Sequence, residues 1–240
     1  MCLLESLRQR IRGLGSESAA LKVRRFFKTG PGDYGEGDLF LGVSVPQLRA
    51  LLNSAEELSS AQVVELLGSQ WHEERLFGLL LLVRRFRASP EGGELRDRLA
   101  ALYLQNLASV NNWDLVDSSA PQILGVWLLN RDRSLLDGLA ASPIMWERRV
   151  AVVATQAFIG QSDFEWTFRL VRLLLGDPHD LIHKACGWML REAYKKEAAP
   201  VLGFLEEHGP RMPRIMLRYA IERVPATERK FIGRLAPRVS

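Results

Sequence analysis

Apolar residues recur at a helical spacing along nearly all of this 240-residue chain, and no stretch alternates apolar and polar residues as a half-buried strand would. Two clear stripes run through residues 3–14 and 164–175. Proline and glycine interrupt the pattern at short intervals, and helices of about 10 to 15 residues fit between these breaks. The periodicity therefore predicts an all-α fold.

A weak repeat is superimposed on this pattern. Several of the expected helices begin with a basic or polar residue that is followed by small and aliphatic residues. These starts lie roughly 34 to 38 residues apart, which is the spacing of helical-hairpin repeats, and they fall at Arg75, Trp113, Arg149, Lys184 and Arg218. Because each helix pair leaves an apolar face open, stacked neighbours complete the core. We predict a HEAT-like helical-repeat solenoid, a curved α-α superhelix, that forms one domain over residues 1–240.

Composition excludes several classes of protein. The two cysteines, Cys2 and Cys186, form no CxxC motif and no cluster with histidine, so we expect neither a metal nor another cofactor, and a reducing compartment. Charges interrupt the apolar start of the chain, and the longest apolar run, residues 77–83, is too short to cross a bilayer. We therefore expect a cytoplasmic protein without a membrane partner. The net charge of +4 only mildly favours an anionic ligand.

Trp113 and Asp117 are four residues apart, which places them on one face of a helix, whereas Asp114 points elsewhere. Pro121 cannot donate the helical hydrogen bond to the carbonyl of Asp117, so the helix should kink or restart there. A kink beside a carboxylate would expose it to a cleft. The alternative is that Asp117 caps a new segment at residues 118–121, because Asp and Ser favour helix starts.

A basic–aromatic–basic stripe, Lys184, Trp188 and Arg191, has the i, i+4, i+7 spacing of one helical face. Such a stripe suits a nucleic-acid backbone, with cations on phosphates and the indole on a sugar or base. The alternative is a core tryptophan flanked by solvated charges. The remaining tryptophans, Trp71, Trp127 and Trp166, lie among aliphatic residues and are expected to be packing residues.

Arg148 and Arg149 open another expected helix just after Trp146. Two adjacent arginines cannot share a direction, so one should face the groove while the other pairs with a neighbour such as Glu147 or lies in water. Both are also acceptable as ordinary surface arginines, and the sequence alone leaves these alternatives open.

The segment from Lys28 to Asp38 holds four glycines and a proline and cannot form a regular helix. It is either a connector between helices or a loop whose backbone approaches a ligand or DNA. Because it lacks the Lys-Ser/Thr ending of a P-loop, nucleotide binding is rejected.

Four segments in order, 40–49, 112–117, 146–151 and 182–192, resemble the AlkD-type DNA alkylation-repair glycosylases. This resemblance covers about residues 24–195 and implies HEAT-like helix pairs curved around duplex DNA. It further implies a monofunctional glycosylase that removes cationic bases of the 3-methyladenine and 7-methylguanine type. The segment from Gly30 to Gly37 is longer than the link in the best-known type of member, which puts the N-terminal DNA contacts in doubt more than the chemistry.

The resemblance also assigns roles to residues. A carboxylate would stabilise oxocarbenium character on the sugar and position water, indoles would hold the deoxyribose, and an arginine would hold a phosphate. The family's active-site arginine falls on Arg149, with Arg148 as the rival. The candidate catalytic residues are Asp117, Trp113, Trp188 and Arg149, and we expect further contacts of a monomer with double-stranded, nucleoid DNA from Arg148, Lys184, Arg191, Arg75 and Lys28.

Two other functions stay open because fold alone does not fix function. One is a non-catalytic HEAT-like module that binds DNA structures or a protein, although retention of all four candidate catalytic residues argues against it. The other is a lesion-specific binder that prefers branched or gapped duplexes and releases no base. Release of free modified bases from methylated duplex DNA separates the glycosylase from both.

Overall fold

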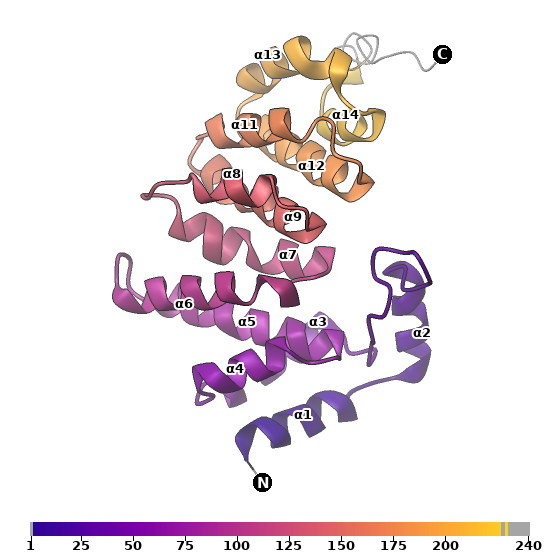
Figure 1. Cartoon of the computed structure of the whole chain (residues 1–240), viewed down its shortest axis with the longest axis vertical. Helices are drawn as coiled ribbons and strands as arrows, with labels where there is room; N and C mark the ends of the chain where they lie inside the picture. The colour runs from indigo at the N-terminus through magenta and orange to yellow at the C-terminus, as the bar shows by residue number, and fades with distance from the viewer. Residues whose placement is uncertain (1, 227–228, 230–240) are drawn as a thin grey trace. The chain divides into compact units, whose positions relative to one another are not determined.

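A computed structural model describes residues 2–226 and 229, and every regular element in this part of the chain is a helix (Figure 1). The only extended pairing recorded there is an isolated bridge between Leu39 and Trp71. The helices pack against their neighbours along the chain, as α4 does with α5 and α8 with α9. The prediction of an all-α helical-repeat fold is therefore confirmed, whereas its assignment to the HEAT-like class stays a prediction.

The chain divides into two compact units, Met1–Ser119 and Ala120–Ser240, called here the N-terminal and C-terminal units. The expectation of one domain over residues 1–240 stays a prediction. The division falls immediately before Pro121, where the sequence predicts a break. There α7 ends at Ser119 and a single π-helical turn, Pro121–Gly125, follows it, closed by a hydrogen bond from Gly125 N–H to the carbonyl of Ala120 (2.9 Å).

The N-terminal unit is built around α5 (His72–Ala88), which packs against α1, α3, α4, α6 and α7. The middle of this helix, residues 76–83, is apolar on all sides, as expected where neighbours surround a helix. Local signals set the ends of the shorter helices: at α4, Ser59 and Gln62 form a reciprocal capping box. The other helices of this unit are α1 (Leu3–Gly13), α2 (Glu17–Phe26), α3 (Val45–Leu51), α4 (Ser60–Leu67), α6 (Glu94–Gln105) and α7 (Trp113–Ser119), with 3-10 turns at Leu52–Ala55 and Leu107–Ser109.

The glycine-rich segment between α2 and α3 folds back onto the end of α2. Gly35 donates its N–H to the carbonyl of Lys28 (3.2 Å), and a β-carbon at this position would lie only 2.6 Å from the carbonyl oxygen of Phe27. Glycine is therefore required there by close approach of backbone to backbone. The segment is thus packed as a connector between α2 and α3, and the alternative of a loop whose backbone approaches a ligand or DNA stays a prediction.

The C-terminal unit is built around α12 (Asp180–Lys196), which packs against α9, α10, α11, α13 and α14. The indoles of Trp127 and Trp166 are half-buried, and an arginine lies over each ring. Trp71 of the N-terminal unit is also half-buried, and no such arginine is recorded over it among the described residues. The other helices are α8 (Leu135–Ala140), α9 (Met145–Ala154), α10 (Gln156–Gly160), α11 (Glu165–Leu173), α13 (Ala198–His208) and α14 (Arg214–Ala220), with a 3-10 turn at Gly209–Arg211. Of the helices described, none is both long enough and apolar enough to span a membrane.

The contact between α12 and α14 depends on Gly187. A β-carbon there would lie 2.6 Å from the β-carbon of Tyr219 and would also meet backbone of α14. We predict that Gly187→Ala lowers the free energy of unfolding by about 1–3 kcal/mol, because the clash outweighs the gain in helix propensity. Gly203→Ala on α13 is the matched control, since a β-carbon there meets nothing within 4 Å, and it should stabilise by about 0.5–1 kcal/mol. Urea denaturation of both variants measures the difference, and equal stability would contradict the packing argument.

Candidate functional site

Four ionisable residues in succession, His72, Glu73, Glu74 and Arg75, begin α5, and all four are buried. Charged groups in a protein interior are costly unless they are paired and hydrogen-bonded. Here each of the four has hydrogen-bond or ion-pair partners. The contacts of Glu73 and Glu74 stabilise the N-terminal unit. Glu73 accepts the backbone N–H groups of residues 41–43 at 2.7–3.2 Å, and Glu74 forms an ion pair with Arg12 at 2.8 Å.

The imidazole of His72 lies between two carboxylates. Its Nδ1 is 2.8 Å from Oδ2 of Asp38, and its Nε2 is 2.8 Å from Oδ2 of Asp114. Burial alone would lower the pKa of His72, but the hydrogen bonds to Asp114 and Asp38 outweigh it and raise the pKa to about 9. His72 is therefore an imidazolium at neutral pH that donates from both ring nitrogens.

Asp38 is the second centre of this network. Besides His72 it accepts hydrogen bonds from the guanidinium of Arg75 (2.6 Å) and from the side-chain amide of Asn112 (3.0 Å). Burial raises the pKa of Asp38, but the hydrogen bond from His72 and the nearby positive charges bring it below its usual value. Asp38, His72 and Asp114 thus join the glycine-rich segment, α5 and α7, and we call these three residues the His72 clamp.

A series of aromatic contacts leads from the His72 clamp to Trp113. The imidazole stacks on Phe40 with centroids 4.4 Å apart, and Phe40 lies 5.0 Å from Phe27. Phe27 in turn stacks on the indole of Trp113 at 5.0 Å and an interplanar angle of 10°. The backbone N–H of Trp113 also donates to the side-chain oxygen of Asn112 (2.8 Å). The half-buried indole is therefore fixed both by its ring face and by its backbone.

Asp117 lies within α7, one turn after Trp113, and is half-buried. The next helical turn begins at Pro121 and its N-cap residue is Ala120, so the alternative in which Asp117 caps that segment is wrong. Burial raises the pKa of Tyr103, the hydrogen bond to Ser119 partly offsets this, and the negative charge of Asp117 adds to the rise. The carboxylate therefore lies within electrostatic range of a buried neutral phenol, in a partly desolvated position.

The two adjacent arginines of α9 differ in their partners. Arg148 forms an ion pair with Asp177 (2.6 Å) and donates to the carbonyls of Ser142 and Pro143. Arg149 donates to the carbonyl of Leu181 (2.7 Å). Arg148 thus pairs with an acid, as expected of one of the two, but the acid is Asp177 rather than Glu147. Both arginines are buried, and the choice of Arg149 over Arg148 as the functional arginine stays a prediction.

Two expected phosphate contacts do not fit the structure. The guanidinium of Arg75 is buried and held by Asp38 and by the carbonyls of Ser69 and Gln70. Arg148 is likewise buried and held by the partners described above. A cation sealed in this way cannot also reach a DNA phosphate without leaving a buried carboxylate unpaired, so we correct both assignments to structural ion pairs.

The three residues of the stripe on α12, Lys184, Trp188 and Arg191, are half-buried. The indole N–H of Trp188 donates to Glu192 (3.1 Å), so this tryptophan lies at the border of the core rather than inside it. Arg191 pairs with Glu222 and Glu192, which reduces the positive charge that it can offer to phosphate. Lys28, the remaining expected DNA contact, is exposed at the end of α2.

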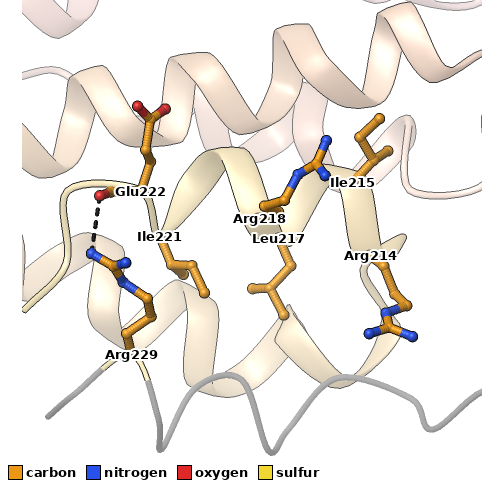
Figure 2. A pocket seen from close by; sticks show the side chains of 7 residues that line it. All are labelled: Arg214, Ile215, Leu217, Arg218, Ile221, Glu222 and Arg229. Carbon is orange, nitrogen blue, oxygen red and sulfur yellow. Dashed lines mark hydrogen bonds between the residues drawn. The ribbon is translucent and has the colours of Figure 1, made fainter. Parts of the chain in front are cut away.

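A pocket of about 610 Å³ lies on α14 of the C-terminal unit, and Figure 2 shows three arginines around it. One of them, Arg229, donates to the backbone carbonyl of Glu222 (3.1 Å). None of the residues that the sequence analysis singled out as catalytic or DNA-binding lines this pocket. Among the residues described, no three His, Cys, Asp or Glu side chains are placed to hold a metal ion.

Sequence reasoning missed Asp38, His72 and Asp114 as a group. A signal was present, because four ionisable residues that directly precede a stretch apolar on all sides, residues 76–83, are expected to be drawn into the core with it. The identity of their partners could not be read, since Asp38 and Asp114 lie 34 and 42 residues from His72.

Comparison with known proteins identifies relatives of the chain. The model of a family described as "DNA alkylation repair enzyme" matches residues 7–224. A solved structure, described as a predicted DNA alkylation repair enzyme from Enterococcus faecalis, is similar with a TM-score of 0.69 at 16% identity, covering 88% of this chain and 97% of that one. At this identity the structural likeness shows the fold alone. No curated protein sequence matches the chain.

The His72 clamp makes stability depend on pH. Because the pKa of about 9 in the folded state exceeds the unfolded value of 6.5, folding takes up a proton between these values. The contribution of His72 is therefore complete below pH 6.5 and is lost as pH rises to about 9, on the order of 3 kcal/mol in total. Urea unfolding at pH 6 and pH 9 should show this fall. In His72→Gln, which does not titrate, the fall across this interval should disappear, and an unchanged pH profile would contradict the assignment.

Proposed function

We propose, on the premise that the chain belongs to the DNA alkylation repair enzyme family, that it is a monofunctional glycosylase that excises cationic N-alkylated purines from duplex DNA. Membership of this family makes the chain a DNA repair enzyme, and the glycosylase reaction and its substrates are our proposal. The observation that carries it is the pair on α7, a half-buried carboxylate at Asp117 one turn from the fixed indole of Trp113.

The chemistry requires one carboxylate and little else. A base alkylated at N3 or N7 carries a positive charge and leaves the sugar as a neutral molecule, so no general acid is needed. Cleavage builds positive charge at the anomeric carbon, which Asp117 would stabilise while orienting the attacking water. Trp113, fixed on Phe27, would lie against the deoxyribose and exclude solvent. Partial desolvation strengthens the attraction between the carboxylate and the developing charge.

The C-terminal unit contributes the other proposed roles. Arg149, assigned by the family resemblance, would hold a phosphate near the lesion once its buried guanidinium becomes accessible, and Trp188 would pack against the sugar. Lys184 is the cation of the α12 stripe for which the described residues record no ion pair, and it is the better candidate there for a phosphate contact. We further propose that the protein acts as a cytoplasmic monomer on double-stranded nucleoid DNA.

We predict that Asp117→Asn lowers the rate of 7-methylguanine release by about 10²–10³-fold, because the neutral amide cannot stabilise the oxocarbenium charge. Affinity for the same duplex should stay within about twofold, since the substitution keeps the shape of the side chain. Single-turnover base release measures the first effect and fluorescence anisotropy the second.

Glu94→Gln on α6 is the matched control, because its carboxylate is exposed and its ion pair within the described part of the chain is with Arg98 one turn away. It should release base at the parent rate. A parent protein that binds methylated duplex but releases no base would instead support the non-catalytic module. Full activity in Asp117→Asn would remove the role given to this carboxylate while leaving the glycosylase open to another residue.

A further inference from the structure

Phe26, the last residue of α2, is the most exposed large apolar side chain in the described part of the chain, at 67%. The next residue, Phe27, is buried and forms the stack with Trp113. Phe26 itself meets the indole of Trp113 edge to face, with centroids 5.8 Å apart. A single exposed apolar side chain is common, but this ring lies in contact with the proposed catalytic indole and is therefore available to the ligand of that site.

Four cations surround this position in the sequence, and all of them are exposed: Lys22, Arg24, Arg25 and Lys28. Throughout the described residues, no ion pair or side-chain hydrogen bond involves any of the four. Some exposed arginines elsewhere have acidic partners, such as Arg98 with Glu94 and Arg169 with Asp137, whereas others such as Arg49 and Arg211 have no ion pair recorded among the described residues. We call these four cations and Phe26 the α2 ledge.

The helix dipole explains only part of this charge. Cations in the last turn are favoured by the partial negative charge at a helix C-terminus, which accounts for Arg24 and Arg25. It does not account for Lys22, more than one turn back from the end of the helix. Among the described residues, no ion pair joins the ledge to the exposed carboxylates of the following segment, Asp33 and Glu36, and Glu36 accepts the N–H of Gly32.

Lys28 adds an independent observation. Its φ of 50° lies in the left-handed region, and it occupies the position that closes α2, with Thr29 N–H bound to the carbonyl of Arg24 (3.3 Å). Glycine is the favoured residue there, and an L side chain costs roughly 1 kcal/mol. The chain holds a lysine at this strained position although no structural partner for its ammonium is recorded among the described residues.

We infer that the α2 ledge binds the DNA duplex next to the damaged nucleotide, with its cations on phosphates and Phe26 against a sugar or base edge. The inference rests on the proposed function, and it assigns the N-terminal DNA contact that the sequence left in doubt. Unpaired cations complement a phosphate backbone, and aromatic rings in such a strip lie against sugars and bases. The contact of Phe26 with Trp113 places the ledge beside the reacting sugar.

Two substitutions test the ledge separately from the fold. Lys28→Gly removes one cation and at the same time relieves the left-handed strain. We expect weaker binding to undamaged fluorescein-labelled duplex, with the slope of log K against log salt reduced by about 0.9, and a melting temperature equal to or above that of the parent. Phe26→Ala should weaken binding about fivefold or more at unchanged salt slope, because a stacking contact is lost without a charge.

Leu173→Ala on α11 is the matched control for Phe26, because Leu173 is 58% exposed and belongs to the C-terminal unit. It should bind within about twofold of the parent, as expected for a surface residue outside the interface. Parent-like affinity and salt slope in both ledge variants would overturn the inference.

A membrane surface is the rival occupant, since exposed aromatic and basic residues also bind anionic lipid. Cosedimentation with phosphatidylserine vesicles distinguishes the two: loss of vesicle binding in the variants with unchanged DNA affinity would overturn the inference in favour of lipid.

Base release by the parent is scored separately. If the parent releases 7-methylguanine while the ledge variants bind like it, the ledge fails and the glycosylase stands. If the variants lose DNA affinity but the parent releases no base, the ledge stands as a DNA contact and the glycosylase fails.

Discussion

The imidazolium of His72, held between the carboxylates of Asp38 and Asp114, is the interaction on which the N-terminal unit depends. Its three members come from the glycine-rich segment, the start of α5 and the first turn of α7. Removing one partner would leave an uncompensated charge in the interior, at a cost of about 3–5 kcal/mol. The three segments therefore fold and unfold together, although they lie far apart in the sequence.

This dependence explains how a helix as short as α7 holds the proposed catalytic pair. An isolated helix of seven residues is not stable in water, so tertiary contacts must fix it. Asp114 is fixed by His72, and Trp113 is fixed by Phe27 and by Asn112. Asp117 lies one turn later on α7, so the contacts that fix Trp113 and Asp114 also fix the backbone position of Asp117. Residues that touch no substrate thus set the geometry of those proposed to do so, which is the usual arrangement of a preorganised site.

The parts of this structure that the sequence predicts are local. Helical periodicity, the break at Pro121 and the shared face of Trp113 and Asp117 all follow from residues within a few turns of one another. The partners of buried charges do not. Arg75 and Arg148 look like surface cations, yet they pair with Asp38 and Asp177, 37 and 29 residues away.

A second limit is that exposure depends on tertiary packing. The sequence places Phe26 and Phe27 side by side, and neither residue type nor spacing says which one is buried. The core of the N-terminal unit takes Phe27, because its ring fills the space between Phe40 and Trp113. Phe26 is then directed outward by the geometry of the helix, so its availability to a ligand follows from the burial of its neighbour.

Charge is distributed in the same way. The net charge of +4 is small because 32 basic residues are nearly balanced by 28 acidic ones, and some of these side chains meet in ion pairs deep in the interior. The positive charge available to bind a polyanion comes from the cations that have no acidic side chain nearby. The α2 ledge holds four such cations within seven residues, as many as the whole chain has in net excess. The attraction of this protein for a phosphate backbone would therefore depend more on where the cations without an ion pair lie than on the total number of lysines and arginines.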